Sequence, residues 1–187
     1  MHLKRQMKLS RAQVLCAAGL LVALTPLGAT TLQQLSLDEM TQQSTSIVRG
    51  RVTGSSTGMR GSNVWTFYQV QVLETFKGHE AGQVQVAVPG GAAGGVRQMV
   101  AGAPSLSSGS EYVLFLWTGR SGLTQVMGLS QGLLSVIHDG QGNTNLVRPA
   151  SKEIMLDSNL KPVMDQGLRL RWSDFRSRVA SRVGAVK

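Results

Sequence analysis

The residues best suited to acid–base or nucleophilic chemistry are two histidines, and each of them is followed directly by an acid. His79 precedes Glu80 and His138 precedes Asp139, in stretches that the sequence predicts to be turns. A Ser-His-acid triad needs a nucleophile, a histidine and an orienting carboxylate that meet in space. A His-acid pair in a turn is more typical of solvated surface, and the chain has no Gly-x-Ser-x-Gly motif. We therefore expect a protein that is not an enzyme and has no catalytic residues, with an unrecognised hydrolase as an alternative.

Metal and phosphate chemistry find little support in the sequence. Two histidines build a three-ligand zinc site only if carboxylates converge on them from distant parts of the chain. No segment has the alternating acids of a calcium loop. The glycine run at residues 90–95 lacks the Gly-Lys-Ser/Thr of a P-loop, and Val96 and Arg97, which follow it, are typical of a strand. We predict no metal and no cofactor, and we interpret the glycine run as a flexible connection.

The adjacent acids Asp38 and Glu39 are explained by helix capping rather than by catalysis. Ser36 and Glu39 have the spacing of a capping box, in which the serine oxygen accepts from an amide three residues on and the glutamate reaches back. Acids also suit the first turn of a helix. The pattern predicts a short helix at about residues 37–44.

Arginines near the C-terminus suggest anion binding. Residues 169–187 carry six cations and one acid, and apolar residues recur there at three- and four-residue steps. This spacing predicts an amphipathic helix at about residues 173–184, with Ser173 as its N-cap. A basic amphipathic helix can bind an anionic surface or polymer, and a plain solvated helix is the other interpretation. The candidate anion-binding residues are Arg169, Arg171, Arg176, Arg178 and Arg182.

The start of the chain has the order of a cleavable secretory signal. Four cations and no acid occur in residues 1–11, an apolar run follows at residues 14–24, and small residues end the segment at Ala29. The apolar run has 11 residues, whereas a membrane-spanning helix needs about 20. We predict a signal peptide at residues 1–29, a mature chain that does not span a membrane, and a periplasmic or extracellular location.

Removal of that signal changes both the cysteine count and the charge balance. Cys16 is the only cysteine, and Leu15 before it argues against lipidation, so the mature chain would have no disulfide. The whole chain has 19 Lys and Arg against 10 Asp and Glu, but the excess lies at its two ends. Trp65, Phe67 and Tyr68 would suit single-stranded nucleic acid. Export and a neutral body argue against it, so we predict no nucleic-acid partner.

The remaining chain is dominated by strand patterns, which predict one mainly β domain at residues 30–187. Alternating or β-branched runs occur from Ile47, at residues 64–76, at residues 83–88 and at residues 112–117. Residues 54–63 are rich in Gly and Ser and are predicted to be a loop. Residues 112–117 are continuously apolar and predict a central strand buried on both faces. Shorter strands are expected within residues 96–100, 123–137 and 145–148, and the sum predicts a closed or nearly closed antiparallel barrel with two terminal helices.

The order of these strands resembles a known family. Three strings carry the resemblance: residues 46–52, residues 68–78 ending in Phe76-Lys77-Gly78, and residues 109–116, Gly-Ser-Glu-Tyr-Val-Leu-Phe-Leu. They resemble the netrin-like, or tissue-inhibitor-of-metalloproteinase-like, OB-fold domains, and most of all cysteine-free exported bacterial proteins that share this layout. The resemblance covers about residues 35–137 and implies an OB-like barrel.

The resemblance also has a limit that bears on function. Metalloproteinase inhibitors of that family bind the target's zinc through an N-terminal cysteine, whereas this mature chain would begin at Thr30-Thr31 without cysteines. Their inhibitory residues therefore cannot be carried over. The hypothesis that remains is an exported, non-enzymatic module that binds a protein partner through loops, with a secreted peptidase as a candidate partner.

Overall fold

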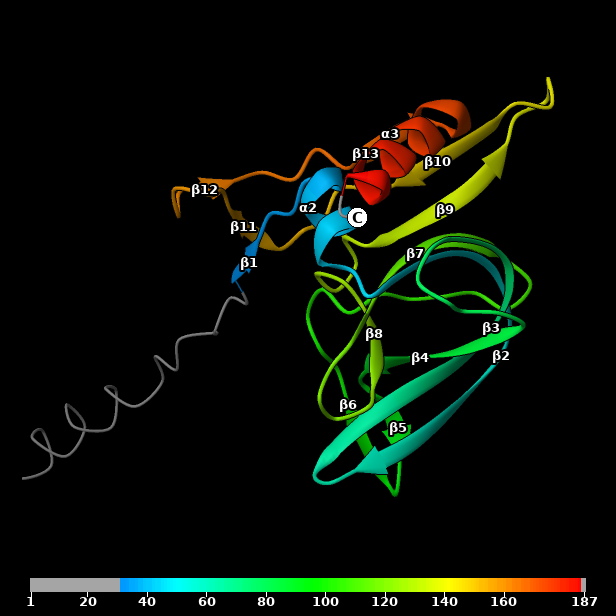
Figure 1. The fold of residues 1–187 in the computed structure, drawn as a ribbon. Helices are drawn as coiled ribbons and strands as arrows, with labels where there is room; N and C mark the ends of the chain where they lie inside the picture. Colours follow the sequence, from blue (N-terminus) through cyan, green and yellow to red (C-terminus); the bar gives the residue numbers. More distant parts are fainter. Residues whose placement is uncertain (1–30, 186–187) are drawn as a thin grey trace, which may run out of the picture.

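The computed structural model describes residues 31–185, so the expected signal peptide and its cleavage site lie outside the described residues. The described chain is mainly β, with antiparallel sheets, one short N-terminal helix and one C-terminal helix, as predicted (Figure 1). The helices are α2 (Leu37–Gln43) and α3 (Trp172–Gly184). The strands are β1 (Thr31–Gln33), β2 (Ser46–Arg60), β3 (Asn63–Lys77), β4 (Gln83–Pro89), β5 (Gly91–Ala93), β6 (Val96–Gln98), β7 (Glu111–Thr118), β8 (Thr124–Val126), β9 (Leu133–His138), β10 (Thr144–Arg148), β11 (Ile154–Leu156), β12 (Pro162–Val163) and β13 (Leu168–Arg171).

One large sheet organises the molecule, and two small sheets lie beside it. The large sheet has the strand order β13-β10-β9-β7-β2-β3-β4, with β8 also paired to β7, and all its ladders are antiparallel. The first small sheet has the order β1-β11-β12, in which β1 and β11 run parallel. The second is the β5–β6 hairpin, which contacts β2 and β3.

Strand β7 is buried on both faces, as its apolar sequence predicts. Tyr112, Leu114 and Leu116 face one hydrophobic core, and Val113 and Phe115 face another. We call these the first core and the second core. Trp117, which the same apolar run included, is 45% exposed at the end of the strand. Because side chains alternate along a strand, one continuous apolar run supplies both cores.

The first core lies inside the curl formed by β2, β3, β4, β7 and β8 (Figure 1). Gly50 is necessary in the first half of β2, because a Cβ there would come within 2.4 Å of Val70 Cγ1. The remaining buried members are Val48, Val52, Val84, Val86, Val88, Leu106 and Val126.

The closed or nearly closed barrel expected from the sequence is not detected among residues 31–185. Strand β4 contacts β8, but no hydrogen-bonded ladder joins the two strands. Strand β8 is only three residues long and pairs with β7, while the sheet continues from β7 through β9 to β10 and β13. The edge of β4 beside β8 therefore stays without a ladder partner in the described chain, and the sheet stays open.

The second core lies under the two helices. Phe175 of α3 is fully buried, with its ring centroid 5.2 Å from that of Phe76 and 6.2 Å from that of Phe115, both edge-on. Val179 is buried in the same core, and the predicted apolar stripe of the C-terminal helix is thereby confirmed. At the start of α3, the Trp172 ring also makes a cation–π contact with Arg49 of β2, whose guanidinium carbon lies 5.3 Å from the ring centroid.

The N-terminal helix α2 begins as its sequence predicts. Ser36 Oγ accepts from the amide of Glu39 at 3.2 Å, and Glu39 Oε2 accepts from the Ser36 amide at 2.8 Å. The hydrogen bond from Ser36 lowers the pKa of Glu39. At the other end of α2, Lys77 Nζ donates to the carbonyls of Thr41 and Gln42 at 2.7 and 2.8 Å. A cation is thus placed at the negative end of the helix dipole.

Three local predictions were wrong. Residues 54–63 are not a loop: β2 runs to Arg60 and turns at Gly61, which has a φ of 62°, so the Gly/Ser stretch pairs with β3. The glycine run at residues 90–95 supplies β5 and the turn before β6, with Gly94 and Gly95 at positive φ. The N-cap of α3 is Arg171 rather than Ser173, because β13 leads directly into the helix and no side chain caps it.

Candidate binding surface

Three of the five arginines predicted to bind anions are engaged by acids of the same chain. Arg178 and Arg182 of α3 both reach the carboxylate of Asp38 in the first turn of α2, Arg178 at 3.6 Å. Arg176 lies 3.1 Å from Glu74 of β3. The hydrogen bond from Arg182 lowers the pKa of Asp38 despite its exposure to solvent. The carboxylates of Asp38 and Glu74 thus offset much of the positive charge that the C-terminal segment carries.

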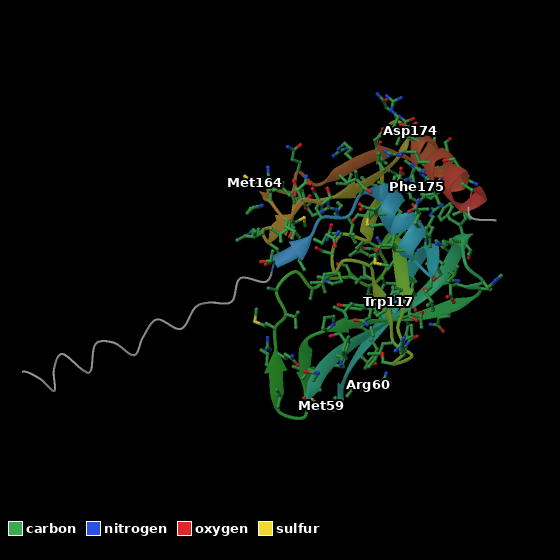
Figure 2. All side chains as sticks on the ribbon, turned by 60° about the vertical axis from the view of Figure 1, so that its left-hand side comes forward. Met59, Arg60, Trp117, Met164, Asp174 and Phe175 are labelled. Carbon is green, nitrogen blue, oxygen red and sulfur yellow. The ribbon has the colours of Figure 1, made fainter. Side chains whose placement is uncertain are left out.

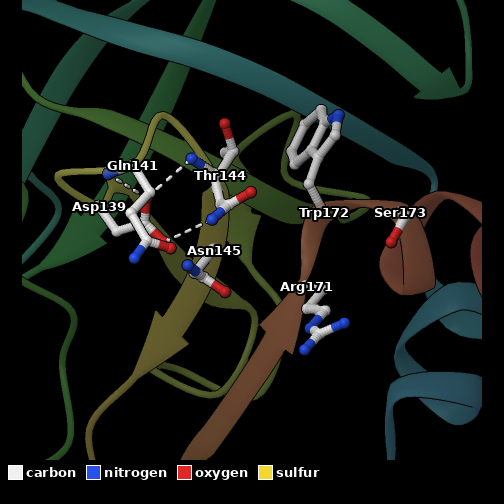
Figure 3. Close-up of a pocket in the computed structure, with 8 residues that line it drawn as sticks. Asp139, Gln141, Thr144, Asn145, Arg171, Trp172 and Ser173 are labelled. Atoms are coloured by element: carbon white, nitrogen blue, oxygen red, sulfur yellow. Dashed lines mark hydrogen bonds between the residues drawn. The ribbon is translucent and has the colours of Figure 1, made fainter.

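The other two predicted arginines, Arg169 and Arg171, lie on β13 with exposed side chains and no ion pair in the described chain. Arg171 borders a cavity of about 590 Å³ between the β9–β10 turn and the start of α3 (Figure 3). Figure 3 shows its side chain pointing away from that of Trp172. The five arginines are therefore not brought together as one anion site, and their binding role stays a prediction.

The two histidines are placed far apart in the fold. His138 ends β9, and its Nδ1 lies 3.1 Å from Thr144 Oγ1. Asp139 turns away from it: its carboxylate accepts from the amides of Gln141 and Asn143 at 2.9 and 2.8 Å, which shapes the hairpin turn (Figure 3). The Asn143 side chain lowers the pKa of Asp139. His79 is exposed in the turn after β3. No described contact joins either histidine to a serine and an acid. The expectation that the protein is not an enzyme stays a prediction.

Three glycine-containing turns meet at the end of the molecule opposite the helices (Figures 1 and 2). They are the β2–β3 turn at residues 61–62, the β5–β6 turn at residues 94–95 and the β7–β8 turn at residues 119–122. Arg60 Nη2 donates to the Ser121 carbonyl at 2.6 Å, which joins the first turn to the third. A Cβ built on Gly94 would lie 3.6 Å from Met59 Cγ, so the second turn packs against the first. We call this region the turn end.

The turn end carries exposed apolar side chains and cations without acids. Met59 is 44% exposed, Val96 49% and Trp117 45%. The exposed cations are Arg60, Arg97 and Arg120, and none of them forms an ion pair within residues 31–185. The sequence has no Asp or Glu in residues 52–73, 81–110 or 112–138. This combination of apolar and arginine side chains is typical of the central part of a protein interface.

The most buried charged groups serve the fold rather than a site. Arg148 of β10 and Asp165 form a bidentate ion pair, in which Arg148 Nη2 donates to Asp165 Oδ1 at 2.8 Å. The two side chains are 9% and 1% exposed. Asp165 also accepts from the amides of Ser151 and Gly167 at 2.7 and 3.0 Å. The hydrogen bond from Arg148 lowers the pKa of Asp165 to about 2, against the opposing effect of burial. The pair fastens residues 149–167, which include β11 and β12, to the large sheet.

No group of three or more His, Cys, Asp or Glu side chains able to hold a metal ion occurs within the described part of the chain. Within the same residues, no helix has the length and apolar character needed to cross a bilayer.

Comparison with known proteins gives no family to which this chain can be assigned. No protein-family model matches the sequence, and no curated protein matches it. The family resemblance drawn from three strand motifs therefore rests on those motifs alone.

The turn end was not predicted from the sequence, although one signal for it was present. Residues 81–110 contain no acid and one arginine, and residues 52–73 contain no acid and one arginine. What could not be read from the sequence is that the turns of three separate hairpins lie side by side, because the β2–β3 turn was interpreted as part of a loop. The distribution of acids along the chain is the clue that would have drawn attention to it.

Proposed function

We propose that this protein is an exported, non-enzymatic binding module that engages a protein partner through the turn end. The observation that carries the proposal is the convergence of three turns that present three exposed apolar residues and three arginines, in segments of the chain that contain no acid. Apolar and arginine side chains together favour a partner surface that has an apolar patch bordered by acids.

The proposal includes an OB-like arrangement for the curled part of the sheet. Five strands surround the first core, and β4 contacts β8 at the open side, which supports an OB-like barrel that is incompletely hydrogen-bonded. Export through the signal at residues 1–29 and a periplasmic or extracellular location belong to the same proposal. A secreted peptidase is the partner class that the family resemblance implies.

The experiment compares two sets of three arginines in the mature chain. One variant carries Arg60→Gln, Arg97→Gln and Arg120→Gln at the turn end. The control carries Arg176→Gln, Arg178→Gln and Arg182→Gln in α3, with the same change in net charge. Each is immobilised, exposed to periplasmic extract and culture medium, and the captured proteins are identified by mass spectrometry.

We expect the wild type and the helix variant to capture the same protein, and the turn variant to lose it by about tenfold or more in affinity. Val96→Ser, at the most exposed apolar residue of the turn end, should weaken capture without unfolding the protein. Loss of the partner in the helix variant alone would move the function to the C-terminal arginines. Equal capture by all three proteins would contradict the proposal.

A further inference from the structure

A second surface lies on the side of β2, β3 and β4 that faces away from the first core. Residues directly opposite each other in neighbouring strands share a face. Val70 of β3 faces the first core, and side chains alternate along a strand, so Trp65 and Phe67 face the other side. Their partners on β2, Gly58 and Ser56, therefore also lie on this outer face. The β5–β6 hairpin covers the core-facing side instead, because Thr57 Oγ1 donates to the Ala92 carbonyl at 2.7 Å. The outer face is left uncovered by that hairpin.

Two aromatic rings stand on the outer face beside very small neighbours. Trp65 and Phe67 are two residues apart on β3 and half-buried, so they share the face. Gly58, opposite Trp65, leaves the edge of the next ring open: a Cβ there would lie 3.7 Å from Phe67 Cε2. A Cβ on Gly54 would meet no atom within 4 Å. Glycine and serine on β2 thus leave open space beside the rings.

Four glutamines continue the outer face beyond the rings. Gln69 lies opposite Gln85, and Gln71 lies opposite Gln83, so the four side chains form a two-by-two array across β3 and β4. Three of them are exposed, and none of the four amide groups has a hydrogen-bond partner in the described chain. Each amide offers two donors and one acceptor oxygen. The array therefore presents both donors and acceptors without charge.

The charged residues lie at the borders of this face. Arg51, opposite Gln71, contacts Glu111 at 2.5 Å. Arg60, at the far end, donates to the Ser121 carbonyl. A phosphate backbone would need cations along the face, and a basic ligand would need acids, but neither is present between these borders. An uncharged ligand matches the face best.

We propose that the outer face of β2, β3 and β4 binds a neutral polysaccharide chain. Trp65 and Phe67 would pack against the apolar faces of sugar rings, and the glutamine amides would exchange hydrogen bonds with sugar hydroxyls. The length of the strand pair, 15 residues in each strand, favours an extended polymer over a single small molecule. The site adjoins the turn end at Arg60, but it does not depend on the protein partner proposed above.

The test uses electrophoresis of the mature protein in native gels containing laminarin, hydroxyethylcellulose or soluble starch, together with titration of cellohexaose and chitohexaose. Heparin and single-stranded DNA serve as charged polymers. We expect at least one neutral glycan to retard the protein, and Gln71→Ala with Gln83→Ala to weaken binding by about tenfold. Gly58→Val should also weaken it, because a branched side chain would cover the Phe67 ring while suiting a strand.

The matched control is Gln42→Ala with Gln43→Ala, two exposed glutamines of α2 at the other end of the molecule. It should bind as the wild type does. Circular dichroism and thermal melting establish that each variant is folded, so that a loss of binding reflects the face itself. The proposal is wrong if no neutral glycan retards the protein, if only heparin or DNA does, or if folded Gly58→Val and glutamine variants bind like the wild type.

Discussion

At the helical end, Arg176, Arg178 and Arg182 each contact a carboxylate of the same chain, whereas the turn-end arginines have no acid in the surrounding sequence. The local sequence suggests the reverse, because the C-terminal segment is the most basic part of the mature chain. Its partner Asp38 lies 144 residues before Arg182. Whether an arginine is available to a ligand is therefore decided by which distant acid the fold brings to it, and not by the charge of its own segment.

The largest expected effect concerns the buried pair that belongs to the helical half. Arg148→Ala would leave the Asp165 carboxylate, 1% exposed, without its cation. We expect the free energy of unfolding to fall by about 3–5 kcal/mol. Urea denaturation measures it, with Arg60→Ala at the turn end as the control, which should cost under about 1 kcal/mol. If the free energy of unfolding falls by the same small amount in Arg148→Ala and Arg60→Ala, the buried pair does not stabilise the fold more than an exposed arginine does.

The pH dependence of stability sharpens the same comparison. Arg148 lowers the pKa of Asp165 from 3.8 to about 2 in the folded state. A carboxyl with a depressed pKa contributes stability that is present above pH 4 and is lost as the pH falls from about 4 to about 2. We expect this group to account for about 2 kcal/mol of that loss.

The measurement is the free energy of unfolding from pH 7 to pH 2 in the wild type and in Asp165→Asn. The variant should be less stable at pH 7 and should have a shallower acid slope. Asp38 and Glu39 also have lowered pKa values, so a smaller slope of the same sign remains. The turn-end variant without its three arginines should keep the wild-type profile, and an identical slope in Asp165→Asn would contradict the assignment.

A smaller effect is expected where α2 ends. Lys77→Met removes the ammonium that donates to the Thr41 and Gln42 carbonyls while keeping much of the side-chain volume. Loss of hydrogen bonds from a charged donor to a helix C-terminus should lower the free energy of unfolding by about 1 kcal/mol. Thermal melting measures the change, and Lys161→Met in an exposed loop is the control. An unchanged melting temperature in Lys77→Met would show that α2 does not depend on this contact.

The smallest stability effect, but the most direct test of the comparison, comes from Asp38→Asn. Exposed ion pairs contribute little, so the expected loss of stability is the smallest of the series. The variant also frees Arg178 and Arg182 and should make the helical end retain anionic polymers. Heparin chromatography should show elution at higher salt than for Glu80→Gln, which changes the net charge equally. Equal elution of the two variants would mean that Asp38 does not mask the helix arginines.

Much of the fold followed from local patterns, because those patterns carry their own physical causes. Ser36 and Glu39 form a capping box within four residues, and the alternation of β4 needs no distant information. Residues 54–63 misled because Gly and Ser suit loops, although here the pairing with Trp65 and Phe67 of β3 keeps them extended. Residues 149–167 were left without strands, since the parallel pairing of β1 with β11 and the Arg148–Asp165 pair are long-range contacts that no local period encodes.

The candidate site was harder to predict than the fold. The arginines of α3 were found by counting charges, but their neutralisation depends on where α2 docks. The turn end needed the three-dimensional meeting of three hairpins, and the glutamine array needed the register of β3 against β4. A one-residue change in that register would put the same glutamines on the opposite face.

Strand β7 contributes side chains to both cores, and this has a consequence for how the molecule opens. Neither core can unfold while the other keeps its packing, because loss of Val113 and Phe115 from the second core displaces Leu114 from the first core. The amides of β7 should therefore exchange with deuterium more slowly than any others, at a rate set by global unfolding. On heating, the curled sheet and the helical layer should unfold in one cooperative transition.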